Sequence, residues 1–273
     1  MRFACLVMFF LFQAGFSFCL ETQNKELNFV IFSDCHLKDT TTIGETILKN
    51  IIDRVNLDES KPEFAVCLGD IVELPKNASI QRYNRTIDKY LSITGRLNIP
   101  LYTIAGNHDL EHGEIASKIF QEKIGPLFFT LQKSEYLLIF LNSESVEKNS
   151  EQMQWLEKIF QKSKEKKIVF MHKPLFAVNL FKSFDIFTTQ YLKDFFEKNN
   201  VFVIFSGHEH FFYQQKYNRI LQIIIGSSGG NVRPAPEGGN SSFQYCRVKI
   251  SGNKVNVEVV PVEISQKEEI FTK

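Results

Sequence analysis

The sequence predicts an α/β domain with a largely parallel sheet and a second, more antiparallel sheet. Short apolar runs alternate with amphipathic helical patterns through the first two thirds of the chain. Beyond residue 211 the helical patterns stop, and strand-like runs follow one another directly. No low-complexity linker or repeat divides the chain after residue 20. Strands that alternate with helices are typical of βαβ units, and consecutive strands are typical of hairpins, so both kinds of sheet are expected in one domain.

The compact apolar runs are expected to be strands buried on both faces, because none of them alternates with polar residues. They are Phe29–Ser33, Phe64–Leu68, Leu101–Ala105, Leu137–Leu141, Ile168–Met171 and Val201–Ser206. Apolar residues at the helical period predict helices between them, over about 43–56, 79–94, 151–163 and 187–198. The later strands are expected at 211–216, 220–226, 242–250 and 255–262.

Composition narrows the possible functions. The 273 residues include 32 Lys+Arg and 31 Asp+Glu, so the net charge of +1 gives no electrostatic case for a protein that binds nucleic acid. Charged residues at 23% and hydrophobic residues at 44% are ordinary globular values and exclude a mainly disordered chain. A chain of this length buries a large core without a disulfide scaffold.

Residues 1–19 have the pattern of a secretory signal peptide. Arg2 is their only charge, 3–12 is unbroken apolar sequence, and Ser17 lies three positions before a cleavage point at Leu20. Cleavage would leave residues 20–273 as a single, secreted or periplasmic domain with no stable membrane anchor. The alternative is an uncleaved anchor through residues 3–20, which is at the short edge of a membrane span.

Polar clusters follow five of the predicted strands. They are Asp34-Cys35-His36, Gly69-Asp70, Gly106-Asn107-His108-Asp109, His172-Lys173-Pro174 and Gly207-His208-Glu209-His210. Each cluster alone has an ordinary structural explanation, such as a turn or a helix cap. Together they contain five of the six histidines. The carboxyl ends of the strands in an α/β sheet form the ligand crevice, so the clusters are expected to meet there.

The residue types in these clusters predict a metal site. Carboxylates, imidazoles and an amide oxygen without a required thiolate suit Fe, Mn, Zn or Mg-like ions better than a soft metal. Two carboxylates, one amide and four imidazoles are too many for one four-coordinate ion. They fit two ions about 3.5–4 Å apart that share a bridging carboxylate. Two such ions would lower the pKa of a bridging water molecule, and the resulting hydroxide could attack a phosphoryl group in line.

In this order the clusters resemble the calcineurin-like metallophosphoesterases, whose pattern is Asp-x-His, Gly-Asp, Gly-Asn-His-Asp/Glu, His and Gly-His-x-His. The matching blocks span residues 34–210. The resemblance implies a four-layer αββα sandwich of two mixed β-sheets flanked by helices, with the metal site at the C-terminal ends of the strands. It also implies the ligands: Asp34, His36 and His210 for one ion, Asn107, His172 and His208 for the other, and Asp70 between them.

The resemblance further implies that His108 is the general acid or stabilises the transition state, and that Asp109 orients it. His108 is the imidazole that remains once the ligands are assigned, and Asp109 is the adjacent carboxylate able to fix its tautomer. The expected activity is that of an exported phosphoesterase acting on a small phosphate monoester or diester. The alternatives are a non-catalytic metal-binding member of the fold, or a nuclease, which would need a local basic groove.

Departures from the family pattern indicate which subgroup of the metallophosphoesterases the sequence resembles. After Gly69-Asp70 the chain reads Ile71-Val72-Glu73-Leu74. It lacks the Asp-Arg-Gly of protein Ser/Thr phosphatases and has Glu73 where purple acid phosphatases have tyrosine. The blocks are most similar to small metallophosphatases and phosphodiesterases, including the class III cyclic-nucleotide enzymes. Glu73 either supports a ligand or is an exposed residue in the first turn of a helix.

Two basic residues are candidates for substrate binding. Lys173 follows a predicted ligand and either meets a phosphate oxygen or is simply solvated. Arg233 ends the Gly- and Ser-rich stretch 226–233, which is expected to be a flexible loop. That loop either brings Arg233 to the substrate or is a plain surface loop.

Overall fold

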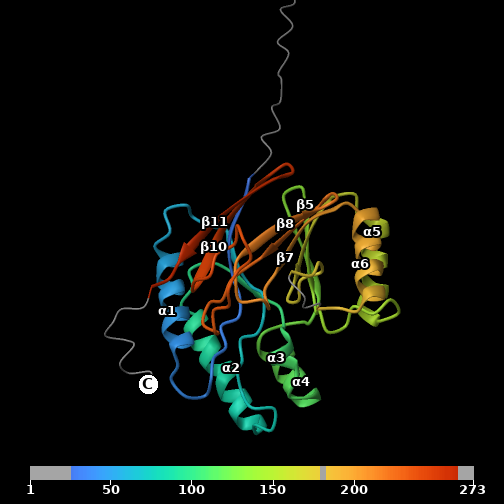
Figure 1. Ribbon diagram of the computed structural model, residues 1–273. Coiled ribbons are helices and arrows are strands. Elements are labelled where there is room, and N and C mark those ends of the chain that lie inside the picture. The colour runs from blue at the N-terminus through green and yellow to red at the C-terminus, as the bar shows by residue number, and fades with distance from the viewer. Residues whose placement is uncertain (1–25, 179–182, 264–273) are drawn as a thin grey trace, which may run out of the picture.

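The computed structural model describes residues 26–178 and 183–263, which form two mixed β-sheets packed face to face between two groups of helices (Figure 1). The four-layer αββα arrangement is therefore confirmed. The predicted signal peptide, residues 1–19, and the alternative anchor, residues 3–20, lie outside the described residues. Among the helices of the described ranges, none is long and apolar enough to span a bilayer.

The first sheet has the strand order β11-β10-β1-β2-β3. Strands β1, β2 and β3 are parallel, and β10 and β11 continue the sheet in antiparallel pairing from β1. The bounds are β1 Leu27–Phe32, β2 Phe64–Cys67, β3 Leu101–Thr103, β10 Gln244–Ser251 and β11 Lys254–Pro261. The helices on its outer side are α1 Ile43–Asn56, α2 Ile80–Thr94 and α4 Glu114–Lys123, which follows the short α3, Asn107–Leu110.

The second sheet has the order β4-β5-β6-β7-β9-β8, with antiparallel strands at both edges. Its bounds are β4 Phe129–Lys133, β5 Tyr136–Leu141, β6 Lys166–Met171, β7 Val201–Ser206, β8 Tyr213–Tyr217 and β9 Ile220–Ile224. Helices α5, Glu151–Lys162, and α6, Ile186–Lys198, cover its outer face.

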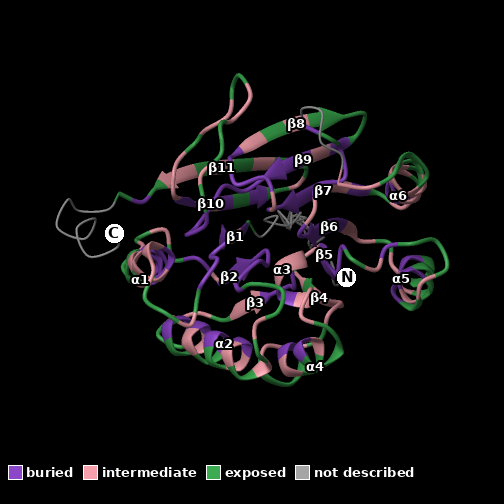
Figure 2. Cartoon of the chain, turned by 60° about the horizontal axis from the view of Figure 1, so that its bottom comes forward, coloured by how far each residue is buried: buried purple, intermediate pink, exposed green. Residues whose placement is uncertain are grey.

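Burial on both faces explains why the strands read as continuous apolar runs. In β1, Phe29 and Ile31 point into the core between the sheets, whereas Val30 and Phe32 point into the core beneath α1 and α2. Figure 2 shows the same pattern, with buried strands in the centre and helices that are buried on one side only. Each of these four side chains thus loses contact with water, which is the main driving force for this packing.

The four C-terminal strands do not form a sheet of their own, so that part of the expectation is wrong. They divide between the two sheets: β8 and β9 extend the second, and β10 and β11 extend the first. The physical reason is edge pairing, because β1 and β7 would otherwise expose unpaired backbone groups. Elements α3, α4 and β4 also appear where none was expected.

Candidate metal centre

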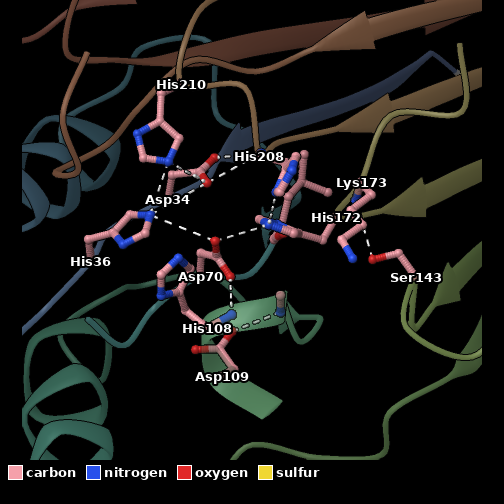
Figure 3. A network of polar contacts seen from close by, with 12 residues as sticks. Asp34, His36, Asp70, His108, Asp109, Ser143, His172, Lys173, His208 and His210 are labelled. Carbon is pink, nitrogen blue, oxygen red and sulfur yellow. Dashed lines mark hydrogen bonds and ion pairs between the residues drawn. The ribbon is translucent and has the colours of Figure 1, made fainter. Parts of the chain in front are cut away.

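The predicted ligands converge where the carboxyl ends of β1, β2, β6 and β7 meet the start of α3 (Figure 3). Backbone hydrogen bonds tie neighbouring loops within each sheet, and the amide of His208, after β7, donates to Oδ2 of Asp34, after β1, at 3.0 Å and so joins the two sheets. The amide of Asp34 donates to the carbonyl of Gly69, and the amide of Gly207 donates to the carbonyl of His172. The site is therefore built on both sheets, and its geometry depends on their packing.

Five of the site residues have left-handed backbone conformations. The φ angles are 55° at Asp34, 47° at His36, 50° at Asp70, 71° at His208 and 58° at His210. Such a conformation costs a non-glycine residue about 1–2 kcal/mol. Strain of this kind persists only where the surrounding packing enforces it, and it concentrates at functional sites.

Two glycines allow the backbone to approach the ligands closely. A Cβ atom on Gly106 would lie 2.2 Å from Oδ1 of Asp70, and one on Gly230 would lie 2.4 Å from Cδ2 of His36. Any side chain at these positions would displace a ligand. The close approach explains why these positions carry glycine.

The first ligand group consists of Asp34, His36 and His210, whose ligand atoms lie within 4.8 Å of one another. Nε2 of His36 is 3.1 Å from Nε2 of His210. Oδ1 of Asp34 is 3.3 Å from Nε2 of His210 and 3.7 Å from Nε2 of His36. All three residues are buried.

The second ligand group consists of Asp70, His172 and His208. Nε2 of His172 is 3.1 Å from Oδ2 of Asp70 and 3.3 Å from Nδ1 of His208. Oδ2 of Asp70 is also 3.8 Å from Nε2 of His36, so this oxygen lies between the two groups. Asn107 lines the hollow beside His208, and its Oδ1 is buried with no hydrogen-bond partner in the described part of the chain.

Three of the histidines are held through the ring nitrogen that points away from the site. In each, Nδ1 lies within hydrogen-bond distance of an oxygen: Oε2 of Glu73 for His36 at 2.7 Å, the carbonyl of Leu68 for His172 at 2.8 Å, and the carbonyl of Asn231 for His210 at 2.7 Å. A donor at Nδ1 leaves the lone pair of a neutral imidazole on Nε2, which faces inward. This is the usual way in which a protein orients a metal-binding histidine.

The inward lone pairs require a cation. Two unprotonated Nε2 atoms of His36 and His210 at 3.1 Å would repel each other. Without a metal, a proton takes the role of that cation. Burial alone would lower the pKa of His36, but the carboxylates of Asp34 and Glu73 raise it to about 10. Burial likewise disfavours charge on His172, yet Asp70 raises its pKa to about 9. The residues therefore fit the two metal ions predicted from the sequence.

Glu73 contacts the site and belongs to a loop after β2, not to the first turn of a helix. The variant Glu73→Gln should bind a metal at the first ligand group about 10–100-fold more weakly. The reason is that the carboxylate of Glu73 orients the His36 ring and makes its Nε2 a stronger metal ligand. A competition titration against a chelator measures this affinity. Glu114→Gln, at an exposed position in α4, is the matched control. An unchanged metal affinity in Glu73→Gln would show that Glu73 does not support His36 as a ligand.

Asp109 does not contact the His108 ring, and this differs from the expectation. Its Oδ1 accepts hydrogen bonds from the amides of Ile71 and Val72, and its Oδ2 accepts one from the amide of Gly106. Burial, and then the charge of Asp70, raise the pKa of Asp109 to about 7. This carboxylate holds together the two loops that follow β2 and β3.

The carboxylates beside His108 are those of Glu111 and Glu73. Nδ1 of His108 is 3.1 Å from Oε1 of Glu111 and 3.6 Å from Oε2 of Glu73. The reason is the helical turn of α3, because neighbouring residues of a helix point in different directions while residues three apart share a face. The i,i+3 spacing of His108 and Glu111 is a signal that the sequence contains, but it has meaning only once this helix is known.

The two basic candidates lie on opposite sides of the ligands. Lys173 borders a hollow of about 540 Å³ together with Asn107 and His208, and its Nζ pairs with Glu144 at 2.8 Å. Arg233 borders a cavity of about 350 Å³ together with His36 and His210. A larger hollow of about 960 Å³ lies beside β10 and β11 and includes none of the ligands.

The stretch before Arg233 is not the flexible surface loop that was expected. Residues 226–230 are buried. The hydroxyl of Ser227 donates to the carbonyl of Gly230 at 2.6 Å, and the amide of Gly230 donates to the carbonyl of Asp34 at 2.9 Å. Its small residues serve close packing over the ligands instead of mobility.

Comparisons with known proteins agree with this fold and site. A model of the calcineurin-like phosphoesterase family matches residues 27–212. The serine/threonine-protein phosphatase CPPED1 of Rattus norvegicus is 27% identical over 183 residues, which cover 60% of this chain and 58% of that protein. The probable glycerophosphodiester phosphodiesterase GpdQ of Arcobacter nitrofigilis is 25% identical over 222 residues, 73% of this chain and 78% of that protein.

Among solved structures, the purple acid phosphatase PPD1 from yellow lupin shares the fold. Its TM-score is 0.64 at 14% sequence identity, over 88% of this chain and 52% of that one. This chain spans about three fifths of the length of the rat relative. The family match covers well over half of the chain, including every predicted ligand. This protein therefore belongs to the calcineurin-like phosphoesterase family.

Proposed function

We propose that this protein is a dinuclear-metal phosphoesterase that hydrolyses a phosphate monoester or diester. The observation that carries the proposal is the position of Oδ2 of Asp70 between the two ligand groups, 3.1 Å from Nε2 of His172 and 3.8 Å from Nε2 of His36. The residues proposed to hold the ions are Asp34, His36 and His210 for the first, Asn107, His172 and His208 for the second, and Asp70 for both.

The mixture of imidazole, carboxylate and amide donors suits Fe, Mn or Zn. Two such ions would polarise the phosphoryl group and lower the pKa of a water molecule, which supplies the nucleophile for in-line displacement. The protein contributes three buried histidines, His36, His172 and His210, whose Nδ1 atoms already lie within hydrogen-bond distance of an oxygen. This support for the ligands limits the reorganisation that metal and substrate binding require.

His108 is the proposed general acid. Its ring is 31% exposed, and it borders the cavity beside the first ligand group, so a substrate can reach it. Nδ1 lies next to Glu111, which leaves Nε2 as the nitrogen for the substrate. As the bond between phosphorus and the leaving-group oxygen breaks, His108 would donate its proton to that oxygen.

A substrate panel on metal-quantified protein tests the proposal. Protein loaded with Mn²⁺ or with iron should hydrolyse phenyl phosphate, bis(p-nitrophenyl) phosphate or both. The metal-free protein should hydrolyse neither. Two ions per chain without turnover of any ester would favour the non-catalytic alternative. Activity confined to nucleic acids, with a steep dependence on salt, would favour a nuclease.

We also propose that residues 1–19 direct export and are then removed. The support is the sequence pattern of one basic residue, an apolar stretch and a small residue before Leu20. N-terminal sequencing of the native protein should begin at Leu20. A native chain that keeps residues 3–20 and sediments with membranes would instead support the anchor.

A further inference from the structure

A cavity of about 350 Å³ opens directly beside the first ligand group. His36 and His210 contribute to its lining, and so do His108, Lys38 and Arg233. A phosphoryl group held at the two ligand groups would therefore place a neighbouring part of its substrate in this cavity. The lining of that space bears on which substrates fit.

The cavity has two cations with spare donor capacity. Lys38 is exposed and forms no ion pair with any described residue. The guanidinium of Arg233 is 54% exposed and no closer than 4.0 Å to Oε2 of Glu209. Lys173, on the other side of the ligands, differs because Glu144 already neutralises it at 2.8 Å.

Negative charge in the same cavity is limited to Glu73, its one acidic lining residue among those described. Oε2 of Glu73 is 2.7 Å from Nδ1 of His36, so this carboxylate already has a partner outside the cavity's free space. Its charge is thus already engaged with a ligand. The remaining charged groups that face the cavity, Lys38 and Arg233, are positive.

Arg233 is held in place by the ligand loop. Its amide donates to the carbonyl of His210 at 3.2 Å, and its Nη1 donates to the carbonyl of His208 at 3.4 Å. An arginine fixed in this way presents its planar fork to an anion with less loss of conformational freedom than a free one.

The opposite wall adds neutral donors. Oγ1 of Thr42 is buried and has no hydrogen-bond partner within the described residues, although Thr42 caps α1. Ile43 and Gly44, in the first turn of that helix, also line the cavity. The amides of a first helical turn have no acceptor within their own helix. These donors supplement the two cations.

We propose that this cavity binds a second anionic group of the substrate, through Arg233 and Lys38. The substrate is then a phosphate ester whose leaving group carries a carboxylate or a second phosphate a few bonds from the scissile phosphate. The volume suits a small polar group, and the charged lining does not suit an apolar one. This inference rests on the proposed phosphoesterase activity and specifies its substrate class.

The test compares two esters of the same shape that differ in charge. Carboxyphenyl phosphate carries an anion, and carbamoylphenyl phosphate carries a neutral amide at the same position. The 2-, 3- and 4-substituted pairs probe different distances. For the best pair, metal-loaded wild-type protein should favour the carboxylate about tenfold or more in kcat/KM, mainly through KM. Arg233→Gln and Lys38→Gln should each lower this ratio about tenfold.

Lys118→Gln is the matched control, because Lys118 is an exposed lysine on α4 and does not line the cavity. Its ratio should equal that of the wild type. A wild type that hydrolyses neither of these esters, nor phenyl phosphate, nor bis(p-nitrophenyl) phosphate would overturn the proposed function itself, whereas hydrolysis of the diester alone would overturn only the second-anion site. Hydrolysis of both esters with a ratio near one, or a ratio that Arg233→Gln and Lys38→Gln leave unchanged, would overturn only the second-anion site. An equal fall of the ratio in Lys118→Gln would also overturn the second-anion site, because it would show that the preference comes from the positive charge of the protein as a whole.

Discussion

An Asp70→Asn variant is expected to retain one metal ion or none per chain and to lose phosphoesterase activity by about 10³-fold or more. Oδ2 of Asp70 is the oxygen between the ligand groups. Its other oxygen, Oδ1, accepts a hydrogen bond from the amide of His108 at 2.9 Å. Asparagine keeps the shape of the side chain and one acceptor oxygen. It removes the negative charge that would offset the repulsion between two neighbouring cations.

Metal content by elemental analysis and steady-state kinetics on the same samples measure this outcome. Asp194→Asn, at an exposed position in α6, is the control for the loss of one carboxylate and should behave as wild type. Two tightly bound ions and wild-type turnover in Asp70→Asn would show that Asp70 does not bridge the metals.

A His108→Ala variant should lose about 10²–10⁴-fold in kcat while it keeps both metals. The physical reason is that alanine cannot protonate the departing oxygen. The loss should therefore depend on the leaving group. It should be large for phenyl phosphate, whose leaving group is basic, and small for 2,4-dinitrophenyl phosphate, whose leaving group departs without protonation.

The control is His112→Gln, at the one histidine outside the site clusters. The His112 ring packs against Tyr83, with ring centroids 5.5 Å apart, and activity close to wild type is expected. Loss of metal in His108→Ala would identify His108 as a ligand. His36, Glu73 and His108 do lie close enough together for that to be a definite alternative result. An equal loss for both esters would also contradict the role of proton donor.

The strands were predictable because the physics that buries them also fixes their composition. A strand with a core on each face has little room for polar residues, so the central part of β1, 29–32, and that of β7, 201–205, appear in the sequence as unbroken apolar runs. The edge strand β4 is less buried, and its Phe129–Lys133 sequence has no comparable pattern. The partition of the C-terminal strands between the sheets was not predictable, because it depends on which edges remain open.

The composition of the site was predictable for a related reason. Ligands follow immediately after buried strands, and parallel topology brings those strand ends together whatever the intervening helices contain. The contacts that orient the histidines through their outer nitrogens were not predictable from the sequence. Glu73 contacts a histidine 37 positions away, and the carbonyl of Leu68 contacts one 104 positions away. Neither pair has a local pattern that marks it.

The sequence by itself determined which side chains gather at the strand ends, because residue type and the order of strands and helices are properties of the chain. Only the tertiary structure decided how those side chains are held. It assigns Asp109 to backbone amides, places Glu111 beside His108, buries the Gly- and Ser-rich stretch 226–230, and holds Arg233 against the carbonyls of His208 and His210. These outcomes follow from left-handed loop conformations and close backbone contacts, which depend on the packing of the two sheets and not on any local run of residues.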